Sequence, residues 1–181
     1  MGVTPSQTVG PFFAYALPYE GGERLVRADD PDAVRIVGAV IDGAGEPVSD
    51  ALIEIWQANR AGRYRHPEDS REELPLEDGF TGFGRCPTDA EGRFEFVTVK
   101  PGPVPPQAPH INVCVLARGL LRQLVTRIYF PDEAAANAAD PLLSSISDPA
   151  ARSTLIARRL DGVLAFDIHL RGERQTAFLD V

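Results

Sequence analysis

A histidine and an asparagine stand two residues apart at the start of an apolar run. They are His110 and Asn112, in the segment APHINV at 108–113, which follows a proline-rich stretch at 100–106. If residues 111–117 form a strand, both side chains point to the same face, because side chains alternate along a strand. Histidine is a good ligand for a transition metal, whereas the amide of asparagine is a poor one. The pair offers half of a metal site, which suggests a subunit that helps to build an active site without performing the chemistry.

Composition limits the kinds of partner that the chain can have. Its 181 residues, 44% of them hydrophobic, suit one domain with a real core. A net charge of -8 argues against nucleic acid or an anionic membrane as a partner. No apolar run approaches the roughly 20 residues of a membrane span. The two cysteines lack metal-type spacing, and no secretion signal is recognisable, so we expect reduced thiols and a cytoplasmic location.

The pattern of turns and short apolar runs predicts an all-β fold. The chain has 16 glycines and 16 prolines, which favour many turns over long helices. We expect a β-sandwich core at 34–181, preceded by a loop-rich N-terminal arm at 1–33, with long loops and one or two short helices. Predicted strands are 34–41, 51–58, 80–85, 93–99, 111–117 and 123–130, with a long loop at 59–78. Helices are predicted at 132–138 and 148–157, the second capped by Asp148, and a closing hairpin joins 162–170 to 174–179.

Six segments in a fixed order carry a family resemblance. They are TPSQTVGPF at 4–12, IWQAN at 55–59, GRYRH at 62–66, the run at 100–112, TRIYF at 126–130 and FDIHLRG at 166–172. With them, nearly the whole chain resembles the intradiol ring-cleavage dioxygenases of aromatic catabolism. The resemblance implies a β-sandwich and a non-haem ferric iron held by two tyrosines and two histidines. It also implies cleavage of catechols between the two hydroxyl-bearing carbons, with O2 and without an external reductant.

The resemblance also shows which iron ligands this chain lacks. Tyr64 matches the first tyrosine ligand and His110 the first histidine ligand. Val104 and Asn112 stand at the positions of the other two. Two of four ligands are therefore missing, and we expect Fe(III) to be bound by a partner rather than by this chain.

Two further positions in the degenerate site differ from the catalytic type. Gln107 replaces an arginine, and Arg127 replaces an uncharged glutamine. The guanidinium of Arg127 would repel a ferric ion. We hypothesise that it fills the vacant place by pairing with the Tyr64 hydroxyl.

The chain resembles the α-type subunit of two-chain family members. This implies pairing with a homologous, iron-bearing β subunit in a higher αβ oligomer, whose substrates are O2 and protocatechuate (3,4-dihydroxybenzoate) and whose product is 3-carboxy-cis,cis-muconate. By resemblance, Thr8, Gly10, Pro11 and Arg118 line the partner's substrate cavity, where the substrate carboxylate needs hydrogen-bond donors or positive charge. Burial of the arm between chains would explain why this loop-rich segment carries the large aromatic residues Phe12, Phe13 and Tyr15.

Less specific interpretations exist for the same residues. Tyr64 can be an ordinary loop tyrosine, His110 a hydrogen-bonded core histidine, and Arg118 a solvated turn residue. A self-sufficient dioxygenase would need all four ligands. A non-catalytic, prealbumin-like β-sandwich binding module would fit the patterns at 38–48 and 89–94, but it needs neither the arm at 4–12 nor the loop that carries Tyr64.

Overall fold

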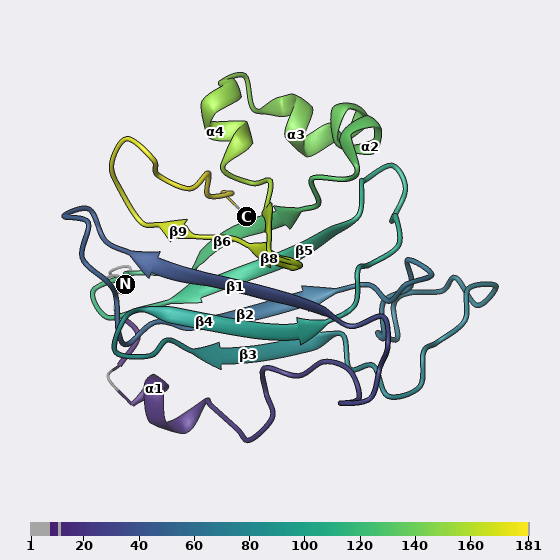
Figure 1. Cartoon of the computed structure of the whole chain (residues 1–181), viewed down its shortest axis with the longest axis horizontal. Coiled ribbons are helices and arrows are strands. Elements are labelled where there is room, and N and C mark those ends of the chain that lie inside the picture. Colours follow the sequence, from purple (N-terminus) through teal and green to yellow (C-terminus); the bar gives the residue numbers. More distant parts are fainter. Residues whose placement is uncertain (1–7, 11, 181) are drawn as a thin grey trace, which may run out of the picture.

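The computed structural model describes residues 8–10 and 12–180, and its core is two β-sheets packed face to face (Figure 1). The strands are β1 (Val34–Ile41), β2 (Leu52–Gln57), β3 (Phe83–Pro87), β4 (Arg93–Thr98), β5 (His110–Leu116), β6 (Leu124–Tyr129), β7 (Arg158–Leu160), β8 (Val163–Ala165) and β9 (Ile168–His169). The predicted all-β sandwich is confirmed, and strands β1 to β6 fall within about three residues of their predicted positions.

The two sheets differ in how their strands pair. One sheet has the order β3-β2-β5-β6, and its neighbours are all antiparallel. The other has the order β4-β1-β8-β7, with β9 also pairing with β1. In that second sheet β8 and β9 run parallel to β1, so the end of the chain is folded back onto its first strand.

The apolar core lies between the sheets and follows the alternation of each strand. On β5 the side chains of Ile111, Val113 and Val115 are at most 2% exposed and belong to the core cluster. The intervening residues therefore face away from the other sheet. This alternation confirms that His110 and Asn112 share a face, which is the outer face of the sheet.

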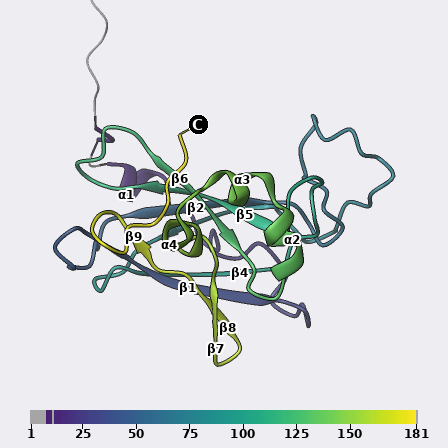
Figure 2. The same cartoon turned by 90° about the horizontal axis from the view of Figure 1, so that it is seen from above.

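Four short helices are present in the described part of the chain. They are α1 (Phe13–Ala16), α2 (Ala134–Ala139), α3 (Pro141–Ser145) and α4 (Pro149–Ser153). The last three follow β6 and precede β7 in the sequence, and they cover one edge of the sandwich (Figures 1 and 2). The side chain of Asp148 caps α4 as predicted, accepting from the amide of Ala150. Helices α1 and α3 were not predicted. No helix among the residues described is long and apolar enough to cross a membrane.

The predicted closing hairpin is wrong in its position. The hairpin that forms joins β7 to β8 through Asp161 and Gly162, both with positive φ. Asp-Gly is a strong turn signal, whereas β9 is satisfied by parallel pairing with β1. Residues 174–179 make only scattered backbone bonds, such as that between the amide of Leu179 and the carbonyl of Val125.

The predicted arm divides into two parts. Leu25 and Val26 are 0% and 7% exposed, and the amide of Leu25 donates to the carbonyl of Val97, so this stretch packs into the sandwich of its own chain. Phe13 is also buried, at 6% exposure, whereas Phe12 and Tyr15 are 77% and 85% exposed. Phe13 is therefore already covered within this chain, whereas Phe12 and Tyr15 are left for a partner to cover if the arm lies between chains.

Candidate functional site around Tyr64

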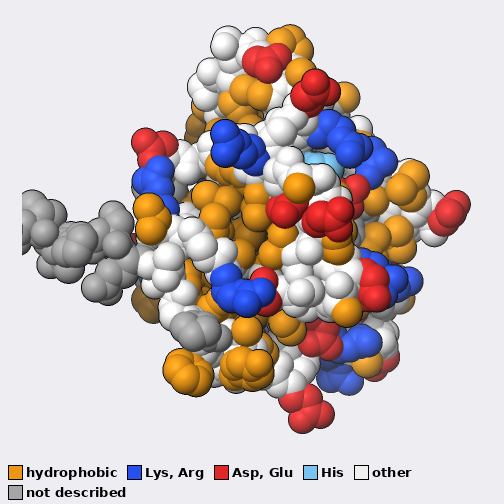
Figure 3. Space-filling view, turned by 90° about the vertical axis from the view of Figure 1, so that its left-hand side faces the viewer, with side chains coloured by type: hydrophobic (Ala, Val, Ile, Leu, Met, Phe, Trp, Pro, Cys, Tyr) orange, Lys and Arg blue, Asp and Glu red, His pale blue; other side chains and the backbone are white. Residues whose placement is uncertain are grey.

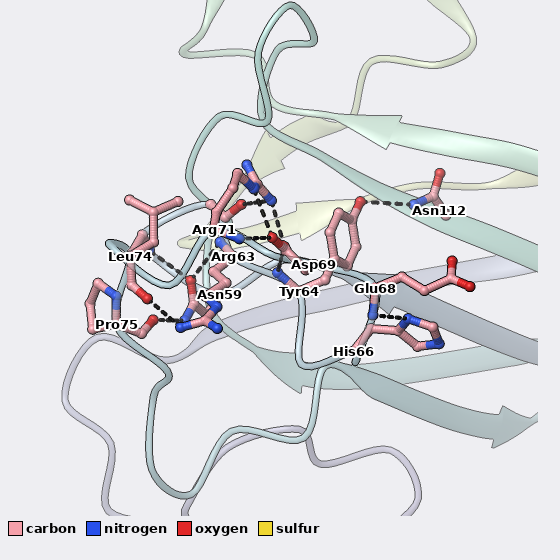
Figure 4. Close-up of polar contacts among 12 residues, drawn as sticks. Asn59, Arg63, Tyr64, His66, Glu68, Asp69, Arg71, Leu74, Pro75 and Asn112 are labelled. Atoms are coloured by element: carbon pink, nitrogen blue, oxygen red, sulfur yellow. Dashed lines mark hydrogen bonds and ion pairs between the residues drawn. The ribbon is translucent and has the colours of Figure 1, made fainter.

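The long loop between β2 and β3 is held in shape by polar contacts (Figure 4). Asn59 is buried at 2% exposure; its Oδ1 accepts from the amides of Ala61 and Arg63, and its Nδ2 donates to the carbonyl of Pro75. Gly62 has φ +83°, and a Cβ there would lie 2.2 Å from the carbonyl oxygen of Pro103. Glycine is therefore required where this loop meets the proline-rich loop at 100–106.

Asp69 fixes the backbone on which Tyr64 is mounted. Its Oδ2 accepts from the amide of Tyr64 at 2.8 Å and from Arg71 Nη2 at 2.6 Å. The Arg71 guanidinium holds the pKa of this carboxyl well below its usual range. Arg71 also donates to the carbonyl of Gly62 at 2.9 Å, so the ion pair closes the loop around Tyr64 (Figure 4).

The Tyr64 ring packs on Trp56, and its hydroxyl is tied to β5. The two rings are stacked, with centroids 5.7 Å apart, and the hydroxyl accepts from Asn112 Nδ2 at 3.3 Å. Burial raises the pKa of Tyr64 above its ordinary value, so the phenol stays protonated at neutral pH. A tyrosine ligand binds ferric iron as phenolate, and this environment disfavours that form.

Arg127 connects Asn112 to the proline-rich loop. Its Nε donates to Asn112 Oδ1 at 2.9 Å, and its Nη1 donates to Gln107 Oε1 at 2.6 Å and to the Tyr129 hydroxyl at 3.4 Å. The expected direct bond between Arg127 and the Tyr64 hydroxyl is not among these contacts, so that hypothesis is wrong. Asn112 lies directly opposite Arg127 in the β5–β6 register, so its amide stands between the guanidinium and the phenol and bonds both.

His110 is a buried, hydrogen-bonded histidine. It is 3% exposed, and its Nδ1 donates to the carbonyl of Ala108 at 2.8 Å. Burial, reinforced by the charge of Arg127, lowers the pKa of His110 to about 4, so the ring is neutral near pH 7. His110 is thus a buried histidine with a hydrogen bond at Nδ1, as the less specific interpretation expects.

These residues do not fit ferric iron. The cluster offers a protonated phenol, a buried imidazole, an amide, the hydrocarbon side chain of Val104 and a guanidinium cation. Among the residues described, no group of three or more His, Cys, Asp or Glu side chains could hold a metal. The structure thus brings Tyr64, His110, Asn112, Gln107 and Arg127 together as predicted, with Val104 close by, because the amide of Gln107 donates to its carbonyl at 2.8 Å. The group forms a hydrogen-bonded cluster rather than a metal centre.

An open depression lies over Tyr64. Its volume is about 500 Å³, and it is lined by Trp56, Tyr64, His66, Glu68, Asp69, Ser70, Arg71, Val104 and Pro105. A larger hollow of about 960 Å³ lies between α4 and residues 165–177, and it contains none of the residues predicted from sequence.

Of the residues predicted to serve a partner's cavity, those that the structure describes do not line the depression over Tyr64. Thr8 and Gly10 are exposed, while Pro11 falls outside the described residues. Arg118 follows the opposite end of β5 from His110, and its side chain is 71% exposed and pairs with Asp50.

Sequence reasoning missed two members of the cluster, Tyr129 and Asp140. Both are 0% exposed, and the Tyr129 hydroxyl donates to Asp140 Oδ1 at 3.1 Å. Asp140 precedes Pro141, as Asp148 precedes Pro149, so the same cap signal could have found it.

His110 makes stability sensitive to acid. Its pKa falls from 6.5 in the unfolded chain to about 4 in the folded one, so the unfolded state binds the extra proton between these values. Its contribution is therefore present above pH 6.5 and is lost as the pH falls towards 4. We expect a loss of about 2 kcal/mol in unfolding free energy between about pH 7.5 and pH 5, measured by urea unfolding. In His110→Gln this part of the acid sensitivity should disappear. An NMR titration placing the folded-state pKa near 6.5 would contradict the assignment.

The chain is similar to known dioxygenases over most of its length. The family model described as "Dioxygenase" matches residues 8–172. The chain is 46% identical to the protocatechuate 3,4-dioxygenase alpha chain of Burkholderia cepacia, covering 98% of this chain and 97% of that one. It is 41% identical to the alpha chain of Pseudomonas putida over 98% and 96% of the two chains. With the beta chain of Burkholderia cepacia it shares 40% identity over 88% and 74% of the two chains.

A solved structure shows the same architecture. The dioxygenase domain of a dioxygenase carbohydrate-binding protein fusion from Streptomyces sp. SirexAA-E has a TM-score of 0.58 and 28% identity, covering 97% of this chain and 100% of that one.

Proposed function

The chain belongs to the intradiol dioxygenases, and from this premise we propose that it is the α subunit of a two-chain enzyme that cleaves protocatechuate with O2 to 3-carboxy-cis,cis-muconate. In this proposal the ferric iron, which supplies the redox and Lewis-acid chemistry, is held by a homologous β subunit. The present chain completes the substrate pocket of that partner. The likeness to alpha chains over almost the full length of the sequence supports the assignment.

The observation that carries the proposal is the state of the Tyr64 cluster. Tyr64 and His110 are the two residues that match iron ligands, and both are committed to hydrogen bonds. Burial disfavours the phenolate form of Tyr64, and Arg127 brings a cation into the cluster through Asn112. A chain with this cluster needs an iron-bearing partner to act as a dioxygenase.

The exposed N-terminal surface supports contact with such a partner. Figure 3 shows the end of the molecule near α1, where hydrophobic side chains are exposed among scattered charged ones. Phe12, Tyr15, Tyr19 and Leu121 are between 51% and 85% exposed. Large apolar side chains in such number are costly to leave in water and are typical of an interface. We propose that Thr8, Gly10 and Pro11 approach the partner's substrate from this surface, with Arg118 as a cationic donor.

Iron content and visible absorption test the proposal directly. We expect the chain expressed alone to be colourless and iron-free. Co-expression with its cognate β chain should give a complex with one iron per αβ pair and a tyrosinate-to-ferric absorption band. One iron and the same band in the isolated chain would overturn the assignment of the metal to the partner.

Replacing Tyr64 with phenylalanine should change little. The substitution removes one hydrogen bond of 3.3 Å and keeps the ring on Trp56, so we expect a loss of at most about 1 kcal/mol in unfolding free energy. The iron content and turnover of the assembled enzyme should stay within about twofold of the parent. The lost hydrogen bond stabilises the folded chain and does not stabilise the transition state of the reaction. A large loss of iron would mean that this chain, and not its partner, holds the metal.

A further inference from the structure

Arg127 carries a charge that has no carboxylate partner among the described residues. Its guanidinium makes hydrogen bonds only to the neutral side chains of Asn112, Gln107 and Tyr129, and among the described residues no ion pair includes it. The nearest carboxylate in this network is Asp140, which the Tyr129 hydroxyl separates from the guanidinium. A partly buried arginine without a counter-ion attracts anions, because a charge-assisted bond to a carboxylate compensates for lost hydration.

Two hydrogen-bond donors of the cluster are free to meet such an anion. Arg127 Nη2 makes no hydrogen bond to any described residue, and the side chain is partly exposed. The Tyr64 hydroxyl accepts from Asn112, but its own proton has no acceptor among the described residues. Asn112 bonds to both groups and so holds the two donors on the same part of the outer sheet face.

The depression that Tyr64 lines suits the apolar body of a small molecule. Arg127 is not one of its lining residues and is connected to Tyr64 through Asn112. Its volume of about 500 Å³ falls in the range of ligand sites. Its lining includes the stacked rings of Trp56 and Tyr64 and the apolar side chains of Val104 and Pro105. Of the two acids that line it, Asp69 is neutralised by Arg71 at 2.6 Å, and Glu68 is exposed, where water screens its charge.

We propose that this chain binds a small aromatic carboxylate over Tyr64, with the carboxylate on Arg127 Nη2 and the Tyr64 hydroxyl and the ring against Trp56, Val104 and Pro105. The inference goes beyond the proposed function, because it concerns a ligand of this chain rather than the substrate in the partner's iron site. It requires neither iron nor the partner, so its failure would leave the proposed function untouched.

Fluorescence of Trp56 gives a local measurement of binding. The chain contains one tryptophan, and that residue lines the depression, so emission from the full chain reports on this site alone. The probe is benzoate, compared with its neutral isostere benzamide. We expect saturable quenching by benzoate and at least tenfold weaker binding of benzamide, because the amide cannot make the charge-assisted bond. Equal binding of the two probes, or no saturable response to benzoate, would overturn the proposal.

Variants separate the charge of Arg127 from its structural role. Arg127→Gln should weaken benzoate binding about tenfold, because it removes the cation. Tyr64→Phe should weaken it about threefold, through loss of one neutral hydrogen bond. Arg93→Gln is the matched control, since Arg93 lies on β4 and pairs with Asp89, and its affinity should equal that of the parent. Thermal unfolding of each variant identifies any that fails to fold. The proposal is wrong if folded Arg127→Gln and Tyr64→Phe both bind benzoate as the parent does.

Discussion

Replacing Arg118 with alanine is expected to lower kcat/KM of the assembled enzyme for protocatechuate by about 10- to 100-fold, with the iron content unchanged. Hydrogen bonds to charged groups contribute about 1.5–3 kcal/mol, which corresponds to this range. The guanidinium is well placed to act on a second chain, because its side chain is 71% exposed and is steadied by Asp50. Steady-state kinetics and metal analysis on the same preparation provide the test.

A second substrate and two control variants identify what Arg118 does. If it meets the substrate carboxylate, catechol, which lacks that group, should be turned over equally by the parent and by Arg118→Ala. Arg118→Lys should recover part of the loss, since it keeps the charge but not the planar fork. Arg93→Ala removes an arginine of similar exposure, 65%, at the start of β4, and should have no effect. Parent-like kinetics of Arg118→Ala would show that this arginine is a solvated turn residue.

The sandwich strands could be predicted because burial between two sheets imposes a period of two. Strand β5 shows this most simply, since Ile111, Val113 and Val115 enter the core and the alternate residues do not. Strands β7 and β8 have three residues each, which is too few for a pattern. Strand β8 is positioned by pairing with the distant β1, and β7 by pairing with β8. The pairing with β1 is a tertiary effect.

The membership of the Tyr64 cluster could be predicted, but its hydrogen bonds could not. The resemblance brought Tyr64, His110 and Arg127 into one site. Whether Arg127 bonds to the phenol or to Asn112 depends on the β5–β6 register and on the side chain of Gln107. Which of several neighbouring acceptors a donor such as Arg127 chooses cannot be predicted from the spacing of residues in the sequence.

Asp140 should be the most important polar side chain for the stability of this region. It is 0% exposed, and its carboxylate accepts from the amides of Ala108, Leu142 and Leu143 and from the Tyr129 hydroxyl. It therefore caps α3, anchors the end of the proline-rich loop and orients Tyr129 beneath Arg127.

Asp140→Ala is expected to lower the unfolding free energy by about 4 kcal/mol, because it leaves several buried donors without a partner, each at a cost of about 1–3 kcal/mol. Asp148→Ala is the matched control. Asp148 also precedes a proline and caps a five-residue helix, α4, but it is exposed and accepts from one amide, so its loss should cost about 1 kcal/mol. Urea unfolding of both variants measures the difference. Equal losses would mean that Asp140 acts only as a helix cap, and the cluster beneath Arg127 would then owe its shape to the strand register and the proline-rich loop.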